Sequence, residues 1–205
     1  MKVTIIGTGN MARGIGSRLL AGENEITVLG KEKDAADQVA QDLGGSVRSG
    51  TFGSDPVDGE VVVLAVYYPD AIKAVEELGD ELDGKVVVDI TNPVNETYDA
   101  LVVAPDGSAA RDIAERAPGG AKVVKAFNTT FANTLKEDRQ LDVFIAGDDE
   151  GAKATVRQLV EGGGLRAVDA GPLARARELE ALGYLHMALQ QPLDTGFGSA
   201  VKVIA

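Results

Sequence analysis

Residues 2–16 read "KVTIIGTGNMARGIG", and this stretch predicts the fold of the chain. A short apolar run typical of a strand comes first, two glycines follow at once, and the apolar residues after them are spaced as in a helix. Gly7 would permit a tight turn, Gly9 would let the backbone approach a pyrophosphate, and the small Ala12 would let the helix pack on the strand. The helix start would then offer free N–H groups to phosphates. The alternative is a plain turn, but the strand and helix on either side favour a dinucleotide site.

The same alternation continues along the chain, as in parallel strands joined by crossover helices. Two runs, "VVVLAV" and "KVVVDI", are apolar on both faces, which is typical of strands covered by helices on both sides. The expected strands are 3–6, 26–29, 61–66, 86–90, 122–127, 143–146 and 166–169, with a weak edge strand near Val47. The expected helices are 11–21, 33–42, 70–78, 108–116, 149–161 and 173–189. We therefore predict an α/β fold with a doubly wound, mostly parallel sheet of the Rossmann type.

Two domains are expected within this fold. Residues 1–128 would form the dinucleotide-binding domain. Residues 129–205 continue the α/β pattern and would form a small C-terminal extension that completes the sheet and the acceptor site.

The composition argues against several kinds of catalytic site, metal site and partner. The 205 residues include no cysteine and one histidine, which argues against disulfides, a cysteine nucleophile and histidine-rich or thiolate metal sites. The net charge of −12 repels nucleic acids and anionic lipids. No run approaches the ~20 apolar residues of a membrane span, and a strand starting at Lys2 leaves no room for a signal peptide. We expect a cytoplasmic protein in which a bound cofactor reacts with a small molecule. Neither nucleic acid nor a membrane is expected as a partner.

The end of the second expected strand indicates which nicotinamide cofactor is used. An acidic residue at this point would bind the ribose 2′-hydroxyl of NAD. The sequence here is "VLGKEK", so Gly30 and Lys31 take that place and Lys33 is close by. Two lysines could neutralise a 2′-phosphate, which favours NADP(H). The alternative is that both lysines are solvated at a helix start, with Glu32 between them.

Four stretches carry a resemblance to a known family: "IIGTGNMARGI", "VVVDITNPVN", "VVKAFNTTFAN" and "VFIAGDDEGAKATVRQLVEGGGLRAVDAGPL". Over Lys2 to about Leu189 the chain resembles the NADPH-dependent coenzyme F420 reductases, also called F420H2:NADP oxidoreductases. The last stretch is the most specific, because glycine loops are shared by many dehydrogenases. The resemblance implies direct hydride transfer between C4 of the nicotinamide of NADP(H) and C5 of the deazaflavin, and we expect a homodimer.

The resemblance also implies roles for single positions. Residues 8–11 match the family's pyrophosphate loop, Lys31 matches its 2′-phosphate arginine, and residues 128–132 match the segment beside the nicotinamide and the deazaflavin. The segments "AVYYPDA" and "TNP" match others that border the cofactor. The expected cofactor-binding residues are Gly7, Thr8, Gly9, Asn10, Met11, Gly30, Lys31, Lys33, Ala65, Val66, Tyr67, Asn92, Pro93, Asn128, Thr130 and Ala132.

No catalytic acid, base or nucleophile is expected, since hydride transfer between stacked rings depends on positioning. Asn92 and Asn128 could hydrogen-bond the nicotinamide amide or ribose, although asparagines also serve in turns. His186 lies beside an apolar stripe of helical spacing, which favours a structural or surface role.

The identity of the acceptor stays open on sequence grounds. Archaeal members of the family carry histidine where this chain has Asn128 and proline where it has Phe131. The "FN" pair is more similar to the NADPH-binding domains of membrane ferric reductases and to a group of small bacterial oxidoreductases. The alternatives are therefore an NADPH-dependent reductase of a flavin, a quinone or a metal chelate, or a non-catalytic NADPH-binding module.

Overall fold

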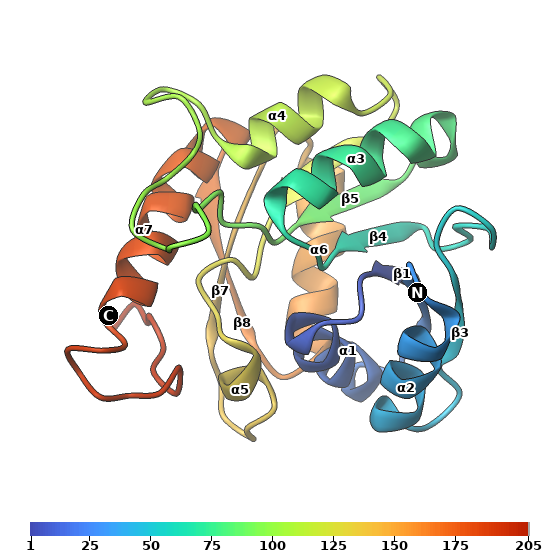
Figure 1. The fold of residues 1–205 in the computed structure, drawn as a ribbon, viewed down its shortest axis with the longest axis horizontal. Helices are drawn as coiled ribbons and strands as arrows, with labels where there is room; N and C mark the ends of the chain where they lie inside the picture. The colour runs from blue at the N-terminus through green and yellow to red at the C-terminus, as the bar shows by residue number, and fades with distance from the viewer. Residues whose placement is uncertain (205) are drawn as a thin grey trace.

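The structure, a computed structural model, describes residues 1–204; Ala205, the last residue of the predicted extension, lies outside the described residues. Its centre is an eight-stranded sheet in the order β3-β2-β1-β4-β5-β6-β7-β8 (Figure 1). The strands are β1 Lys2–Ile6, β2 Glu25–Gly30, β3 Arg48–Thr51, β4 Val61–Leu64, β5 Val86–Asp89, β6 Lys122–Lys125, β7 Asp142–Gly147 and β8 Arg166–Gly171. Neighbours are parallel except β6 and β7, which are antiparallel. The predicted doubly wound, mostly parallel α/β sheet is confirmed.

Helices cover both faces of the sheet. One face carries α1 Asn10–Ala21, α2 Lys33–Leu43, α5 Ala132–Leu135 and α6 Glu150–Gly162. The other carries α3 Tyr68–Leu78, α4 Ala109–Arg116 and α7 Ala176–Ala188, with the 3-10 turns η1 Gly79–Leu82 and η2 Leu173–Arg175. No helix within residues 1–204 is long and apolar enough to cross a membrane.

Strand β4 shows why this sequence forms a central strand. Val61 and Val63 join the core cluster on the α1 face, whereas Val62 and Leu64 join the cluster on the α3 face. All four side chains are buried, because successive strand residues point to opposite sides and both sides are covered. Each buried aliphatic side chain contributes roughly 1.5 to 3 kcal/mol.

Several strands end earlier than the sequence pattern predicts. The expected strand 61–66 ends at Leu64, and the expected strand 122–127 ends at Lys125. Beyond these ends, Ala65, Val66 and Phe127 line a cavity, whereas Ala126 is buried without lining it. The weak edge strand expected near Val47 exists as β3. The expected helix 173–189 divides into η2 and α7, and the four-residue α5 is too short to give a periodic signal.

Candidate functional site

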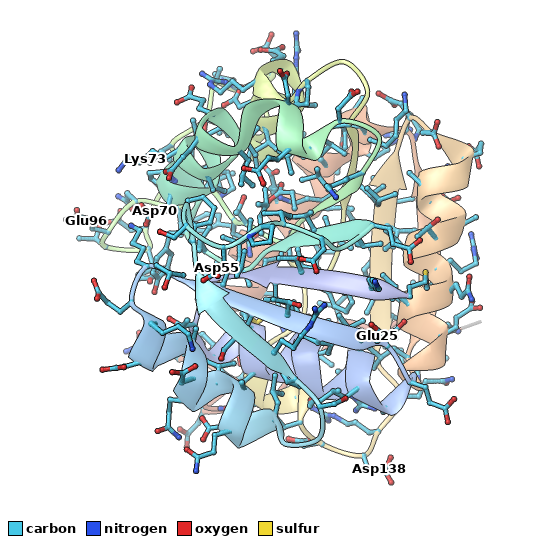
Figure 2. All side chains as sticks on the ribbon, turned by 90° about the vertical axis from the view of Figure 1, so that its right-hand side faces the viewer. Glu25, Asp55, Asp70, Lys73, Glu96 and Asp138 are labelled. Atoms are coloured by element: carbon cyan, nitrogen blue, oxygen red, sulfur yellow. The ribbon has the colours of Figure 1, made fainter. Side chains whose placement is uncertain are left out.

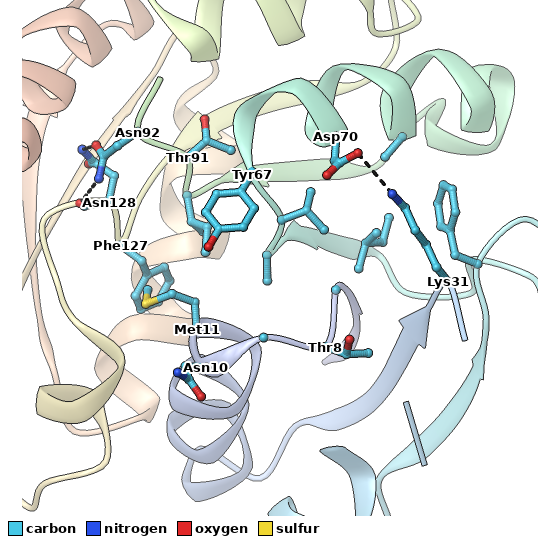
Figure 3. A pocket seen from close by; sticks show the side chains of 18 of the residues that line it. Thr8, Asn10, Met11, Lys31, Tyr67, Asp70, Thr91, Asn92, Phe127 and Asn128 are labelled. Atoms are coloured by element: carbon cyan, nitrogen blue, oxygen red, sulfur yellow. Dashed lines mark hydrogen bonds and ion pairs between the residues drawn. The ribbon is translucent and has the colours of Figure 1, made fainter. Parts of the chain in front are cut away.

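A cavity of about 760 Å³ opens at the carboxyl ends of the strands around β1. Strand order reverses here, since β2 lies on one side of β1 and β4 on the other, and such switch points are where ligands bind in open α/β sheets. Figure 3 shows Lys31 and Asp70 at one end of the cavity, and Asn92 and Asn128 at the other. The volume lies within the ordinary range of small-molecule sites.

The glycine loop between β1 and α1 forms the floor of the cavity. Gly7 has φ of 119° and donates its N–H to the carbonyl of Leu29 at 2.8 Å. A Cβ on Gly7 would lie 2.3 Å from the oxygen of Ala65, so only glycine fits the turn. Gly9 differs, because a Cβ there would meet no protein atom within 4 Å and would point into open space. Helix α1 has no side-chain cap at Gly9, which leaves its first N–H groups available to an anion.

Two lysines flank an acid at the β2 end of the cavity. Lys31 Nζ lies 3.1 Å from Asp70 Oδ1, and Lys73 Nζ lies 3.7 Å from the same oxygen. Figure 2 shows Asp70 and Lys73 together on α3. Both lysine side chains are about three-quarters exposed, at 76% and 73%, so each can turn towards a ligand. Lys33 is differently placed, since it pairs with Asp37 and does not line the cavity.

The opposite end is built by two asparagines that bind each other. Asn92 Nδ2 donates to the main-chain oxygen of Asn128 at 2.8 Å, and Asn128 Nδ2 donates to Asn92 Oδ1 at 2.9 Å. Asn128 Nδ2 also donates to the oxygen of Leu179 at 2.8 Å. Phe127, directly before Asn128, has φ of 59°, a conformation that is rare outside glycine and that recurs at functional sites.

Two buried polar atoms at this end have no partner within the described chain. They are Asn128 Oδ1 and Thr91 Oγ1, on residues that are 4% and 3% exposed and that both line the cavity. An unpaired buried polar atom costs about 1 to 3 kcal/mol. Because both atoms are buried, either side chain would have to turn towards the cavity to accept a hydrogen bond from a ligand N–H group, such as that of a nicotinamide carboxamide.

The remaining wall is largely aromatic and apolar. Tyr67 and Tyr98 lie at the mouth, and a hydrogen bond to Tyr67 raises the pKa of Tyr98. Phe131 stacks on His186 with ring centroids 4.4 Å apart. His186 is buried, and its nitrogens contact the oxygen of Thr129 at 3.2 Å and Ser199 Oγ at 2.8 Å, so it is held by structural contacts. Burial lowers the pKa of His186.

The cavity brings together most of the cofactor-binding residues that the sequence suggests. Those lining it are Gly7, Thr8, Gly9, Asn10, Met11, Lys31, Ala65, Val66, Tyr67, Asn92, Asn128 and Thr130. Four others lie outside its wall: Gly30, Lys33, Pro93 and Ala132. Gly30 shapes the loop from behind, since a Cβ on it would lie 2.6 Å from Thr8 Cγ2. Pro93 accepts a hydrogen bond from Val102, and Ala132 packs α5 onto α1.

Further lining residues were not expected from the sequence. They include Lys73, Tyr98 and Met187. Asp70, Thr91 and Phe131 also line the cavity, and each lies in a segment that the resemblance places beside the cofactor. Lys73 had a usable signal, because it lies near the start of a helix that follows a central strand. Tyr98 and Met187 had none, since they reach the cavity only through a long loop and through α7.

Comparison with known proteins gives consistent results. The pattern of the family described as "NADP oxidoreductase coenzyme F420-dependent" matches residues 2–93. The chain is 30% identical to an F420-dependent NADP reductase of Methanocaldococcus jannaschii over 92% of both chains. A crystal structure described as that of a putative F420-dependent NADP-reductase from Arthrobacter sp. FB24 superposes with a TM-score of 0.88 at 27% identity, covering all of both chains.

A second kind of relative matches as well. The chain is 32% identical to Metalloreductase STEAP3 of Rattus norvegicus over 88% of its own length. It spans only 36% of that protein.

Proposed function

Since this chain belongs to the F420-dependent NADP reductase family, we propose that it transfers a hydride between NADP(H) and coenzyme F420 in the cavity around β1. It is thus an oxidoreductase with NADP(H) as cofactor and the deazaflavin as co-substrate. The observation that carries the proposal is the pairing of two features in one cavity. A glycine loop with free N–H groups lies on its floor, and a buried amide oxygen without a donor lies at one end.

The residues of the cavity would divide the dinucleotide between them. The backbone of residues 7–11 would bind the pyrophosphate, since Gly9 leaves the space that a phosphate needs. Lys31 and Lys73 would neutralise the 2′-phosphate, releasing Asp70 to solvent. At the far end Asn128 Oδ1 would accept a hydrogen bond from the nicotinamide carboxamide.

The chemistry itself belongs to the two ligands, because reduced NADPH supplies the hydride and the deazaflavin accepts it. What the chain provides is orientation and exclusion of water. Phe131 and Met187 give this end of the cavity an apolar wall. Two hydrogen bonds join Asn92 and Asn128, and they hold the Asn128 amide in one orientation.

The domain organisation, the cellular compartment and the oligomeric state complete the proposal. Residues 1–128 would act as the nucleotide-binding domain, and residues 129–205 would add the acceptor end, to which Phe131 and Met187 contribute. The protein would work in the cytoplasm as a homodimer. Exposed apolar side chains on α7 and after it, among them Leu185, Leu193 and Phe197, support a second copy as partner.

A second candidate is reduction of a metal chelate or a flavin by NADPH. The similarity to a metalloreductase over most of this chain supports it, as does Asn128 in place of the histidine of archaeal members. The cavity wall is compatible with a flavin, because Tyr67 and Tyr98 at the mouth are exposed and can stack on a planar ring.

A panel of acceptors decides between the two. Purified protein and NADPH are mixed with F420, with free FMN and with ferric citrate, and kcat/KM is measured for each. The proposal predicts that F420 has the highest kcat/KM. A higher kcat/KM for ferric citrate or FMN would select the second candidate, and tight NADPH binding without turnover on any acceptor would select a non-catalytic module.

A further inference from the structure

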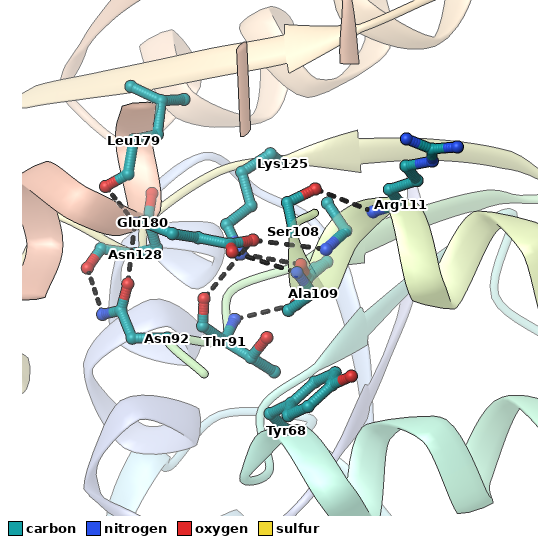
Figure 4. Close-up of polar contacts among 12 residues, drawn as sticks. Tyr68, Thr91, Asn92, Ser108, Ala109, Arg111, Lys125, Asn128, Leu179 and Glu180 are labelled. Carbon is teal, nitrogen blue, oxygen red and sulfur yellow. Dashed lines mark hydrogen bonds and ion pairs between the residues drawn. The ribbon is translucent and has the colours of Figure 1, made fainter. Parts of the chain in front are cut away.

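Three charged side chains are buried together behind the asparagine end of the cavity (Figure 4). Lys125, at the end of β6, contacts Asp89 Oδ2 at 2.7 Å and Glu180 Oε1 at 2.8 Å. The two acids come from different layers, Asp89 from the end of β5 and Glu180 from α7. None of the three side chains is more than 1% exposed. We call Asp89, Lys125 and Glu180 the buried triad.

Every polar atom of the triad has a partner. Lys125 Nζ makes its third hydrogen bond to the oxygen of Thr91 at 2.5 Å. Asp89 Oδ1 accepts the N–H of Thr91 at 2.8 Å. Glu180 accepts the N–H groups of Ala109 and Ala110 at 3.0 and 3.2 Å, at the start of α4. The helix start offsets the second negative charge, and all partners of Glu180 are donors.

These bonds fix the main chain that carries the cavity's unpartnered atoms. Thr91 is held at both its N–H and its oxygen, so the position of its side chain and of the next residue, Asn92, is set by the triad. Glu180 adjoins Leu179, whose oxygen anchors the amide of Asn128. The triad therefore links the loop after β5, the loop after β6 and helix α7 at one point.

Stability alone does not account for such a cluster. Replacing buried ion pairs with neutral side chains of similar volume is often neutral or stabilising, because removing charges from water costs as much as their attraction returns. A directional network that holds three chain segments in one register is the better-supported use of buried charge. The triad is hydrogen-bonded to the main chain of the lining residue Thr91, so its effect on a ligand must be indirect.

We infer that the buried triad is a positioning device for the nicotinamide end of the cavity, holding the lining residues Thr91, Asn92 and Asn128 where they orient the bound ring. This inference rests on the proposed function for the identity of the ligand. The glycine loop and the lysines at the other end are held by different contacts and do not depend on the triad.

The test compares the two ends of the cavity in the variant Glu180→Gln. With the remaining oxygen kept on Lys125 and Ala110, the new N–H₂ group faces the N–H donor of Ala109, which loosens α7 from α4 without adding volume. The probe for the phosphate end is 2′,5′-ADP, measured by calorimetry. The probe for the nicotinamide end is NADPH, followed by its own fluorescence, and hydride transfer is followed as kcat with F420.

We expect 2′,5′-ADP affinity within about twofold of wild type, NADPH affinity reduced, and kcat lowered about tenfold or more, as a small misplacement of reacting groups produces. The matched control is Glu178→Gln on the same helix. The Glu178 carboxylate is exposed, and its ion pair with Arg175 is long, at 3.8 Å. It should leave all three values unchanged. Unchanged kcat and NADPH affinity in Glu180→Gln would overturn the inference, and so would an equal loss of affinity for 2′,5′-ADP.

A second variant covers the case in which Glu180→Gln does not fold. The combination Asp89→Asn, Lys125→Met and Glu180→Gln leaves no unpaired charge, and it is expected to fold and to show the same selective loss. Wild-type kcat and NADPH affinity in the triple variant would overturn the inference, and so would failure of both variants to fold. The binding ratio of NADPH to 2′,5′-ADP is decisive even if wild-type protein does not reduce F420, so failure of the proposed function is distinguishable.

Discussion

Gly7 and Gly9, in the loop after β1, have different roles: the fold requires glycine at position 7, and ligand binding requires it at position 9. A Cβ on Gly7 would lie 2.3 Å from the oxygen of Ala65, and its φ of 119° disfavours any other residue. Strain and overpacking of this kind cost about 1 to 3 kcal/mol each, so Gly7→Ala should lower the free energy of unfolding by roughly 3 kcal/mol. Gly9 has φ of −80° and an open position at Cβ. Gly9→Ala should therefore have a free energy of unfolding within about 1 kcal/mol of wild type, because the lower entropy of its unfolded chain is opposed by a poorer N-cap.

Binding should show the opposite order of effects for Gly9. A methyl group there occupies the space into which a pyrophosphate must come, and loss of one or two backbone bonds to a charged group costs about 1.5 to 3 kcal/mol each. NADPH affinity of Gly9→Ala should fall between about 10-fold and 100-fold or more. Urea unfolding and calorimetry with NADPH measure the two quantities on the same samples. A Gly9→Ala protein with wild-type stability and wild-type NADPH affinity would refute the placement of the phosphates on this loop.

Three further predictions concern other parts of the site. Lys31→Ala should weaken NADPH binding about tenfold while NADH binding stays the same, because only the 2′-phosphate is affected; an unchanged ratio of the two affinities contradicts the role of this lysine. Gly183→Ala would place a Cβ 2.6 Å from Asn92 Oδ1, so it should lower kcat with F420 more than it lowers 2′,5′-ADP affinity, and equal effects would argue against this contact. Because burial lowers the pKa of His186, its neutral form is favoured in the fold. The contribution of His186 to the free energy of unfolding should be full above about pH 6.5. Below that pH it should fall by at most about 1.4 kcal/mol per pH unit, since the unfolded chain takes up the proton first. In thermal unfolding, His186→Gln should lack this pH dependence, and a pH profile identical to that of wild type would contradict the assignment.

Local sequence carries the information for the sheet and for the phosphate end of the cavity. The strands are continuous apolar runs, and the glycine loop joins the first strand directly to its helix, so contacts between neighbours in sequence decide both. Lys31 follows from the same logic, because it comes directly after a strand. The predicted strand ends are wrong where apolar residues such as Ala65 and Phe127 lie beyond the strand and form part of the cavity wall.

The nicotinamide end depends on contacts that are distant in sequence. Tyr98 and Met187 reach the cavity from a long loop and from α7, and nothing near them in sequence indicates this. The buried triad shows the same limit. Asp89 and Lys125 end neighbouring strands in matched register, but Glu180 lies in a helix where an acid is ordinarily exposed. Only the packing of α7 onto α4 reveals that it is buried.

Direct hydride transfer to the deazaflavin is the central claim, and isotope transfer tests it most directly. NADPH carrying deuterium at both C4 positions is incubated with the protein and F420 in ordinary water, and the reduced deazaflavin is analysed by mass spectrometry. The account predicts one deuterium per molecule of reduced F420. Reduced F420 without deuterium, or no reduction of F420 at all, would contradict it.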